Sequence, residues 1–162
     1  MRVHQISRDD AEQFLAFRTQ GLSGDPDAFR VTPEDDAKVG VDAWGSRLAR
    51  DYVVAVTGPN GEWLGIGELS QIDGEKLRHK GLVWGMYVSP TARGPGAADK
   101  IMDAVIGHAI GKLRQLQLTV MADNQRARAF YERHGFTTYA VELGSVRRHD
   151  EFADEALMQR LL

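Results

Sequence analysis

The residues best placed to do chemistry are the glycines of the stretch SPTARGPGAADK, which spans residues 89–100. They follow an apolar run typical of a strand and precede a pattern typical of a helix. A helix that starts directly after a strand presents free backbone N–H groups at its first turn, and together with the helix dipole these groups favour an anion. Small residues would let a phosphate approach the chain closely. A plain strand-to-helix turn would need the same glycines, so the residues alone leave both interpretations open.

The composition excludes several other kinds of chemistry. The chain has no cysteine, which removes disulfides, thiolate catalysis and cysteine-ligated zinc. Its five histidines form neither an H-x-x-x-H nor an H-E-x-x-H pair, so we expect no metal. Asp99 stands where a dinucleotide-binding pattern needs its third glycine, and no Gly-Lys-Ser/Thr follows for a P-loop. The nucleotide-binding motifs therefore do not fit.

Charge and hydropathy limit the partners and the compartment. The formal net charge is −3, which gives no basic field to hold nucleic acid. The first residues lack the apolar core of a signal peptide, and no stretch approaches membrane-spanning length. We therefore expect a cytoplasmic protein that binds neither nucleic acid nor membrane.

The periodicity of apolar residues predicts which elements hold the glycine stretch in place. The expected order is β-α-α-β-β-β-α-β-α-β-β, an α/β (α+β) fold with one mixed sheet in a single domain, residues 1–162. The predicted strands lie near 1–7, 52–56, 62–72, 81–88, 116–120, 136–143 and 155–162, and the predicted helices near 9–22, 32–50 with a break at Gly40, 98–113 and 124–134.

Single residues refine these elements. Gly85 inside the strand at 81–88 indicates a bulge or a close backbone approach. The helix at 98–113 keeps helical spacing from Ala98 through Ile110 to Leu113, so all three should face the core. The run Arg147–Asp150 is polar and is expected to form a loop between the last two strands.

Two segments carry a family resemblance. The segment VWGMYVSPTARGPGAADKIMDAVIGHA (83–109) resembles motif A of the GNAT N-acetyltransferases, and its residues 93–98 match that family's [Q/R]-x-x-G-x-[G/A] signature. The segment VMADNQRARAFYERHGF (120–136) resembles motif B, and GDPDAFRVTPEDD (24–36) resembles a loop of small bacterial members. The resemblance implies a mixed, mostly antiparallel sheet of six to seven strands, splayed between the fourth and fifth strands and flanked by about four helices.

The resemblance also implies acetyl-CoA as co-substrate. Its pyrophosphate would be held by amides of Gly94, Gly96, Ala97 and Ala98, while Pro95 removes one N–H from this set. Arg93 would reach a phosphate, or it could be a solvated surface arginine.

The family's other cofactor contacts fall on two further elements. Amides of Met86 and Val88 would pair with the pantetheine arm and polarise the thioester carbonyl, although both residues could simply pack in the core. Asn124 would touch the arm as well as cap a helix. Tyr131 would protonate the departing thiolate, unless it only packs its ring beneath the helix.

An acceptor amine must lose a proton before it attacks, because an alkylamine with a pKa near 10.4 is almost entirely protonated at neutral pH. The strand at 81–88 contains no acid. Glu68, on the neighbouring strand, is the best candidate for the base, directly or through water, and the competing interpretation is a solvated strand glutamate. Four aromatic residues could line the acceptor pocket, although each type is also common in cores: Phe29, Trp44, Trp84 and Tyr139.

The sequence therefore predicts an N-acetyltransferase that moves acetyl from acetyl-CoA to a primary amine of a small molecule by direct attack in a ternary complex. One alternative acceptor is a protein or peptide N-terminus or lysine. A CoA-binding sensor without turnover is a further alternative, and Asn124 and Tyr131 argue against it. The family resemblance also implies a possible homodimer through the last strands.

Overall fold

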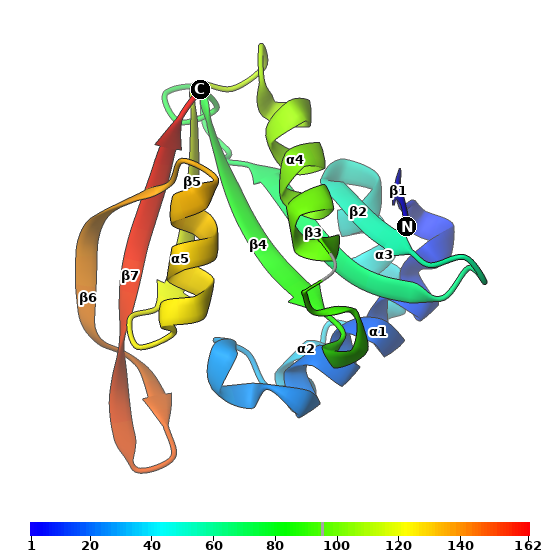
Figure 1. The fold of residues 1–162 in the computed structure, drawn as a ribbon, viewed down its shortest axis with the longest axis horizontal. Helices are drawn as coiled ribbons and strands as arrows, with labels where there is room; N and C mark the ends of the chain where they lie inside the picture. The colour runs from blue at the N-terminus through cyan, green and yellow to red at the C-terminus, as the bar shows by residue number, and fades with distance from the viewer. Residues whose placement is uncertain (95) are drawn as a thin grey trace.

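A single mixed sheet organises the protein (Figure 1). The computed structural model describes residues 1–94 and 96–162, and its strands lie in the order β1-β2-β3-β4-β5-β7-β6. Paired neighbours are antiparallel except β4 and β5, which are parallel. The strands are β1 (Arg2–Gln5), β2 (Tyr52–Thr57), β3 (Trp63–Gln71), β4 (Lys80–Val88), β5 (Gln115–Met121), β6 (Thr137–Arg148) and β7 (Glu151–Leu161). The predicted mixed, mostly antiparallel sheet is confirmed.

Helices cover both faces of this sheet. The α-helices are α1 (Ala11–Gly24), α2 (Pro33–Ala37), α3 (Val41–Arg50), α4 (Ala97–Ala109) and α5 (Gln125–Arg133). Successive side chains of β2 point to opposite faces, so Val53 joins the core beneath α1 and α3 while Val54 joins the core beneath α4. In the part of the chain that the structure describes, no helix is both long and apolar enough to span a membrane.

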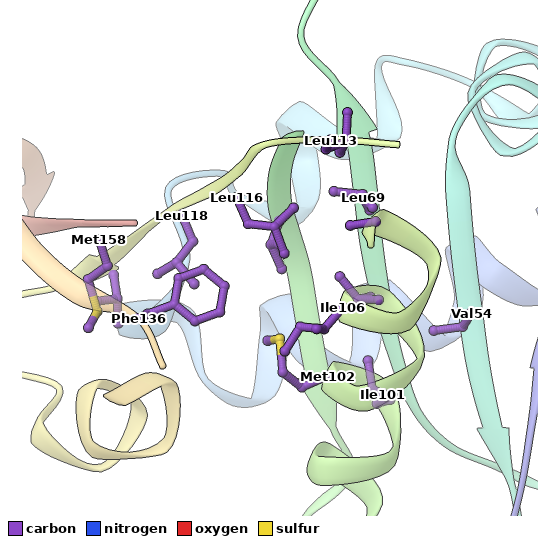
Figure 2. Packing of buried hydrophobic residues seen from close by; sticks show 14 of the residues in the cluster. Val54, Leu69, Ile101, Met102, Ile106, Leu113, Leu116, Leu118, Phe136 and Met158 are labelled. Carbon is purple, nitrogen blue, oxygen red and sulfur yellow. The ribbon is translucent and has the colours of Figure 1, made fainter. Parts of the chain in front are cut away.

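The larger core lies between α4 and the sheet (Figure 2). Ile101 and Met102 project from α4 toward the strands, and Phe136 and Met158 continue the same core toward β7. Helix α4 ends at Ala109, so the prediction of a helix up to Leu113 was wrong at its last turn. Ile110 is 60% exposed because the chain turns there, helped by the left-handed Gly111 (φ 80°). Leu113 is still buried, but from the following turn.

The predicted helix starts are confirmed by their caps. Thr32 Oγ1 accepts a hydrogen bond from the N–H of Asp35 at 3.1 Å, with Pro33 in the first helical position. Asn124 Oδ1 accepts one from the N–H of Ala127 at 3.0 Å and caps α5. These side chains fix where α2 and α5 begin.

The last two strands form a longer hairpin than predicted. Arg147 and Arg148 belong to β6, so the expected polar loop shrinks to a turn at His149 and Asp150. The prediction failed because most of β6 is exposed, and a strand exposed in this way can carry polar residues. The pairing of Arg148 opposite Glu151 places opposite charges across the hairpin, which favours this register.

The sheet is splayed between β4 and β5, as expected. The two strands pair only where residues 80–82 of β4 lie beside 115–117 of β5. Farther along β4, Trp84 pairs with Glu68 but Tyr87 pairs with Ile66, so β4 carries one extra residue there. This is the predicted bulge at Gly85, whose φ of 63° suits glycine and few other residues. The bulge lies where the sheet opens.

Candidate active site

The opening beside β4 contains a cavity of about 550 Å³. It is bounded by the end of β4, the turn before α4 and one side of α5. All of the residues predicted to bind the cofactor line it: Met86, Val88, Arg93, Gly94, Gly96, Ala97, Ala98, Asn124 and Tyr131. Residues from three separate segments thus meet around one space.

A second cavity of about 470 Å³ is lined by residues of α1, α2, α3, β4 and β5. Phe29, Trp44 and Trp84 line it, as predicted for an acceptor pocket. Tyr139 lines neither this cavity nor the first, and its side chain is 48% exposed. The structure does not bring Tyr139 to either cavity, because β6 is the edge strand and is separated from β5 by β7.

The two cavities meet between β4 and α5. Both are lined by Phe29, Met86, Asn124 and Tyr131. A molecule in one cavity can therefore approach a molecule in the other near Met86 and Tyr131. This arrangement suits a reaction between two substrates that enter from different sides.

The turn before α4 has the geometry of an anion site. Gly94 and Gly96 have φ values of 99° and 89°, so the turn itself requires glycine. Apart from chain neighbours, no atom of residues 1–94 or 96–162 lies within 4 Å of where a Cβ would be at either glycine. The glycines therefore serve the turn and also leave open space in front of the N-terminus of α4, where a phosphate would fit. Pro95, which was expected to remove one N–H, lies outside the described residues.

Arg93 is engaged within the protein rather than free in solvent. Its Nε donates to the backbone oxygen of Val88 at 3.2 Å, and its Nη2 lies 3.4 Å from the carboxylate of Asp25. These contacts hold the turn against the end of β4. The guanidinium still lines the first cavity, so a phosphate could share it.

The backbone at the end of β4 offers hydrogen-bond donors to the opening. The N–H of Ser89 donates to the oxygen of Leu64 at 2.9 Å, so Ser89 faces β3. Successive residues of a strand alternate between their two neighbours, and the N–H groups of Val88 and Met86 therefore face the splayed side. An extended chain placed there could pair with them as a further strand would.

Tyr131 lies where both cavities meet, with its ring packed edge-on against Phe130 and Phe136. No hydrogen bond to its hydroxyl forms within the described part of the chain. Burial raises the pKa of Tyr131 to about 12, so the phenol keeps its proton at neutral pH. The group can donate a proton and is unsuited to act as a base.

Glu68 is buried, with 1% of its surface exposed, so the interpretation as a solvated glutamate was wrong. Burial raises the pKa of Glu68 to about 8, although Arg18, whose Nη1 lies 3.3 Å from its Oε1, opposes that rise. A Cβ on Gly85 would lie 1.9 Å from the same oxygen. Only glycine at the bulge leaves room for the carboxylate. Because Gly85 lines the second cavity, the bulge connects Glu68 with that cavity.

Arg18 and Asp36 complete a buried cluster that the sequence analysis missed. Arg18 Nε lies 2.8 Å from Asp36 Oδ2, and the guanidinium also lies over the rings of Trp44 and Trp84, at 5.0 and 5.5 Å from their centroids. One signal for Arg18 was available, because it stands four residues from both Phe14 and Leu22 on the apolar face of α1. Asp36 gave no such signal, since acids in a first turn are common.

Trp84 is held in the wall of the second cavity by a hydrogen-bonded chain. Its Nε1 donates to Ser70 Oγ at 2.8 Å, and that hydroxyl donates to Asp51 Oδ2 at 2.8 Å. The indole also stacks on Trp44 with a centroid distance of 5.9 Å. Two hydrophilic side chains, Ser70 and Asp51, and the stacking on Trp44 thus fix this aromatic wall. In the described ranges, no group of three or more histidine, aspartate or glutamate side chains is placed to hold a metal.

The family is shown by comparison with known proteins. Residues 12–136 match the model of the Acetyltransferase (GNAT) family, which is more than half of the chain. The protein therefore belongs to the GNAT acetyltransferase family and is an acyltransferase. Both the family and the enzyme class expected from motifs A and B are confirmed. No curated protein matches the sequence significantly.

Solved structures show the same fold. A GNAT-family acetyltransferase from Streptococcus pneumoniae is similar over 99% of both chains, with a TM-score of 0.88 and 22% identity. Ribosomal-protein-alanine N-acetyltransferase from Brucella melitensis is similar over 100% of both chains, with a TM-score of 0.82 and 19% identity. A phosphinothricin acetyltransferase from Sinorhizobium meliloti, solved with acetyl-CoA, has a TM-score of 0.79 and 20% identity over 99% of this chain and 88% of that one.

Proposed function

We propose that the protein transfers acetyl from acetyl-CoA to a primary amine of a small molecule by direct attack in a ternary complex. The observation that carries this proposal is the pair of cavities that meet at Met86 and Tyr131. In this arrangement one cavity takes the donor and the other takes the acceptor. The amine then reaches the thioester through the splayed strands, without a covalent enzyme intermediate.

The first cavity fits the donor, which supplies the thioester when bound. Amides at Gly94, Gly96, Ala97 and Ala98 would hold its pyrophosphate at the start of α4. Amides of Met86 and Val88 would pair with the pantetheine arm, and the Met86 amide would polarise the thioester carbonyl. Asn124 uses Oδ1 as a cap, which leaves its NH₂ group free to donate to the arm.

The second cavity favours a small acceptor over a peptide. Its volume of about 470 Å³ falls in the usual range for small-molecule sites. Its walls include Phe29, Trp44 and Trp84, whereas a peptide acceptor would need an open groove. Among proteins of similar fold, one is named for a small molecule, phosphinothricin, and another for the alanine of a ribosomal protein. Fold alone therefore supports either acceptor class, and the aromatic cavity favours the small molecule.

Glu68 is our proposed general base. Its raised pKa brings it close to neutral pH, which is where a base works best. Its carboxylate is behind the bulge, so we propose that a water beside Gly85 carries the proton from the amine to Glu68. Tyr131 would then protonate the departing thiolate from the other cavity.

The test of this function is release of the CoA thiol from acetyl-CoA in a panel of small amines, amino acids and peptides. We expect turnover with small primary amines and an acetylated amine as product by mass spectrometry. Turnover with peptides alone would support the alternative acceptor class. If the protein binds acetyl-CoA but releases no thiol with any acceptor in the panel, it is a sensor and the proposed activity is overturned.

The anion site can be tested at Ala98. This residue lies in the first turn of α4 and lines the first cavity, so Ala98→Glu adds bulk and negative charge without straining a left-handed backbone. We expect acetyl-CoA affinity, measured by calorimetry, to fall by about tenfold or more. Lys100→Glu is the control, since Lys100 is exposed in the same helix and does not line the cavity. Equal affinities in the two variants would contradict the assignment of this turn.

We also propose that the protein works in the cytoplasm and that two copies associate through the β6–β7 hairpin. Three apolar residues at alternate positions of the edge strand β6 are exposed: Tyr139, Val141 and Leu143. A row of this kind is typical of an interaction surface. Light scattering would show twice the mass of one chain if the dimer forms.

A further inference from the structure

Among residues 1–94 and 96–162, one arginine in the wall of the second cavity has no carboxylate within salt-bridge distance. Arg18 is paired with Asp36 and Glu68, and Arg30 is paired with Glu155. Arg47 lines the same cavity, yet within residues 1–94 and 96–162 no carboxylate oxygen lies within 4.0 Å of its guanidinium. Arg47 acts on Glu68 only at longer range, so its guanidinium can still form an ion pair with a molecule in the cavity.

The position of Arg47 is restrained by an aromatic ring. Its guanidinium carbon lies 4.7 Å from the centroid of the Trp44 ring, a cation–π contact that orients the planar group. Trp44 itself is buried and lines the cavity, and its Nε1 finds no hydrogen-bond partner in the described part of the protein. Buried polar groups normally have a partner. The guanidinium N–H groups of Arg47 and the indole N–H of Trp44 therefore lie side by side, and neither has a hydrogen-bond partner among the described residues.

We propose that the acceptor amine carries a carboxylate and that Arg47 is the specificity-determining residue that binds it. This inference rests on the proposed transfer to a small-molecule amine. The planar guanidinium matches a carboxylate with two parallel hydrogen bonds, and the partial burial of Arg47 strengthens the attraction. The amine, at the other end of the acceptor molecule, would lie near the bulge at Gly85, beside Glu68. The cavity would then complement both ends of a small zwitterion.

The proposal predicts discrimination by charge in the wild-type protein. The substrates are ω-amino acids of increasing length, from glycine to aminohexanoate, each compared with its neutral amide, and the aminoalkylphosphonates of the same lengths. We expect kcat/KM at the best length to be about tenfold or more higher for the carboxylate than for the amide. A higher value for the phosphonate would identify that anion instead and overturn the carboxylate assignment.

Variants of Arg47 assign the discrimination to this residue. We expect Arg47→Gln to lower kcat/KM for the carboxylate about tenfold more than kcat/KM for the amide, so that the two substrates become nearly equal, and Arg47→Lys to keep part of the preference. Arg78→Gln is the matched control because Arg78 is exposed and lies outside both cavities. Acetyl-CoA affinity measured on each variant checks that it has folded.

The outcomes separate this inference from the proposed function. Equal rates with carboxylates and amides in the wild type, or an equal loss for both in Arg47→Gln, would overturn the role of Arg47 while acetyl transfer stands. Turnover with other amines but with none of the ω-amino acids, their amides or the aminoalkylphosphonates would also overturn the role of Arg47 while acetyl transfer stands. If no small amine is acetylated at all, the proposed function fails and the inference fails with it.

Discussion

Replacing Tyr131 by Phe is expected to lower kcat by about 10- to 10³-fold while acetyl-CoA affinity changes little. The variant keeps the ring and its packing against Phe130 and Phe136 and removes only the hydroxyl. Since burial raises the pKa of Tyr131 to about 12, the wild-type phenol is protonated throughout the neutral range and can donate a hydrogen bond to the sulfur as negative charge develops there. The loss should fall on kcat because the proton is needed only when the thiolate departs.

The upper end of that range is limited by the leaving group. A thiol with a reference pKa near 8.5 leaves tolerably well even as a thiolate, so the phenol assists this step without being indispensable. Tyr139→Phe is the control, since it removes a hydroxyl from an exposed tyrosine that lines neither cavity. Steady-state kinetics on one good acceptor would compare the two variants. A wild-type rate in Tyr131→Phe would make Tyr131 a packing residue and leave water as the proton donor.

Replacing Glu68 by Gln is expected to lower kcat/KM by roughly 10²-fold near pH 8. With a pKa of about 8, Glu68 is mostly protonated at lower pH, so the wild-type rate should rise as the carboxylate forms. Above a pH of about 10.4 the free amine is plentiful and the loss should shrink. The measurement is the pH profile of kcat/KM for both proteins. Parallel profiles of equal height would exclude Glu68 as the base.

The same substitution has a second, independent readout in stability. The pKa of Glu68 is raised from 4.5 to about 8 on folding, so the folded protein binds this proton more tightly than the unfolded chain does. The resulting stability is fully present below pH 4.5 and is lost as the pH rises to about 8. We expect the free energy of unfolding, measured with urea, to fall more between these pH values in the wild type than in Glu68→Gln. If both proteins lose stability equally, the carboxyl is not held in its neutral form.

Much of the local structure and the cofactor side of the site could be predicted from the sequence. The caps at Thr32 and Asn124 depend on residues close together in the chain, and the bulge at Gly85 was indicated by a glycine inside an apolar strand pattern. The predicted cofactor residues line one cavity because they belong to two compact motifs, each joined directly to the ends of its strand and helix. Two local predictions were wrong. Helix α4 ends before Ile110 because the chain turns there, and β6 extends through polar residues because it is an exposed strand.

The acceptor side was decided by tertiary structure. Arg18 meets Asp36 across 18 residues and Glu68 across 50, and no periodicity reports which charges from distant segments will be buried together. Strand order places Tyr139 away from both cavities. Arg18 and Arg30 contact the nearby acids Asp36, Glu68 and Glu155, and among residues 1–94 and 96–162 no carboxylate lies within salt-bridge distance of Arg47. Sequence patterns report which residues share a face of their own helix or strand. The partners of a side chain, and with them its pKa and charge balance, depend on long-range packing of elements that lie far apart in the chain.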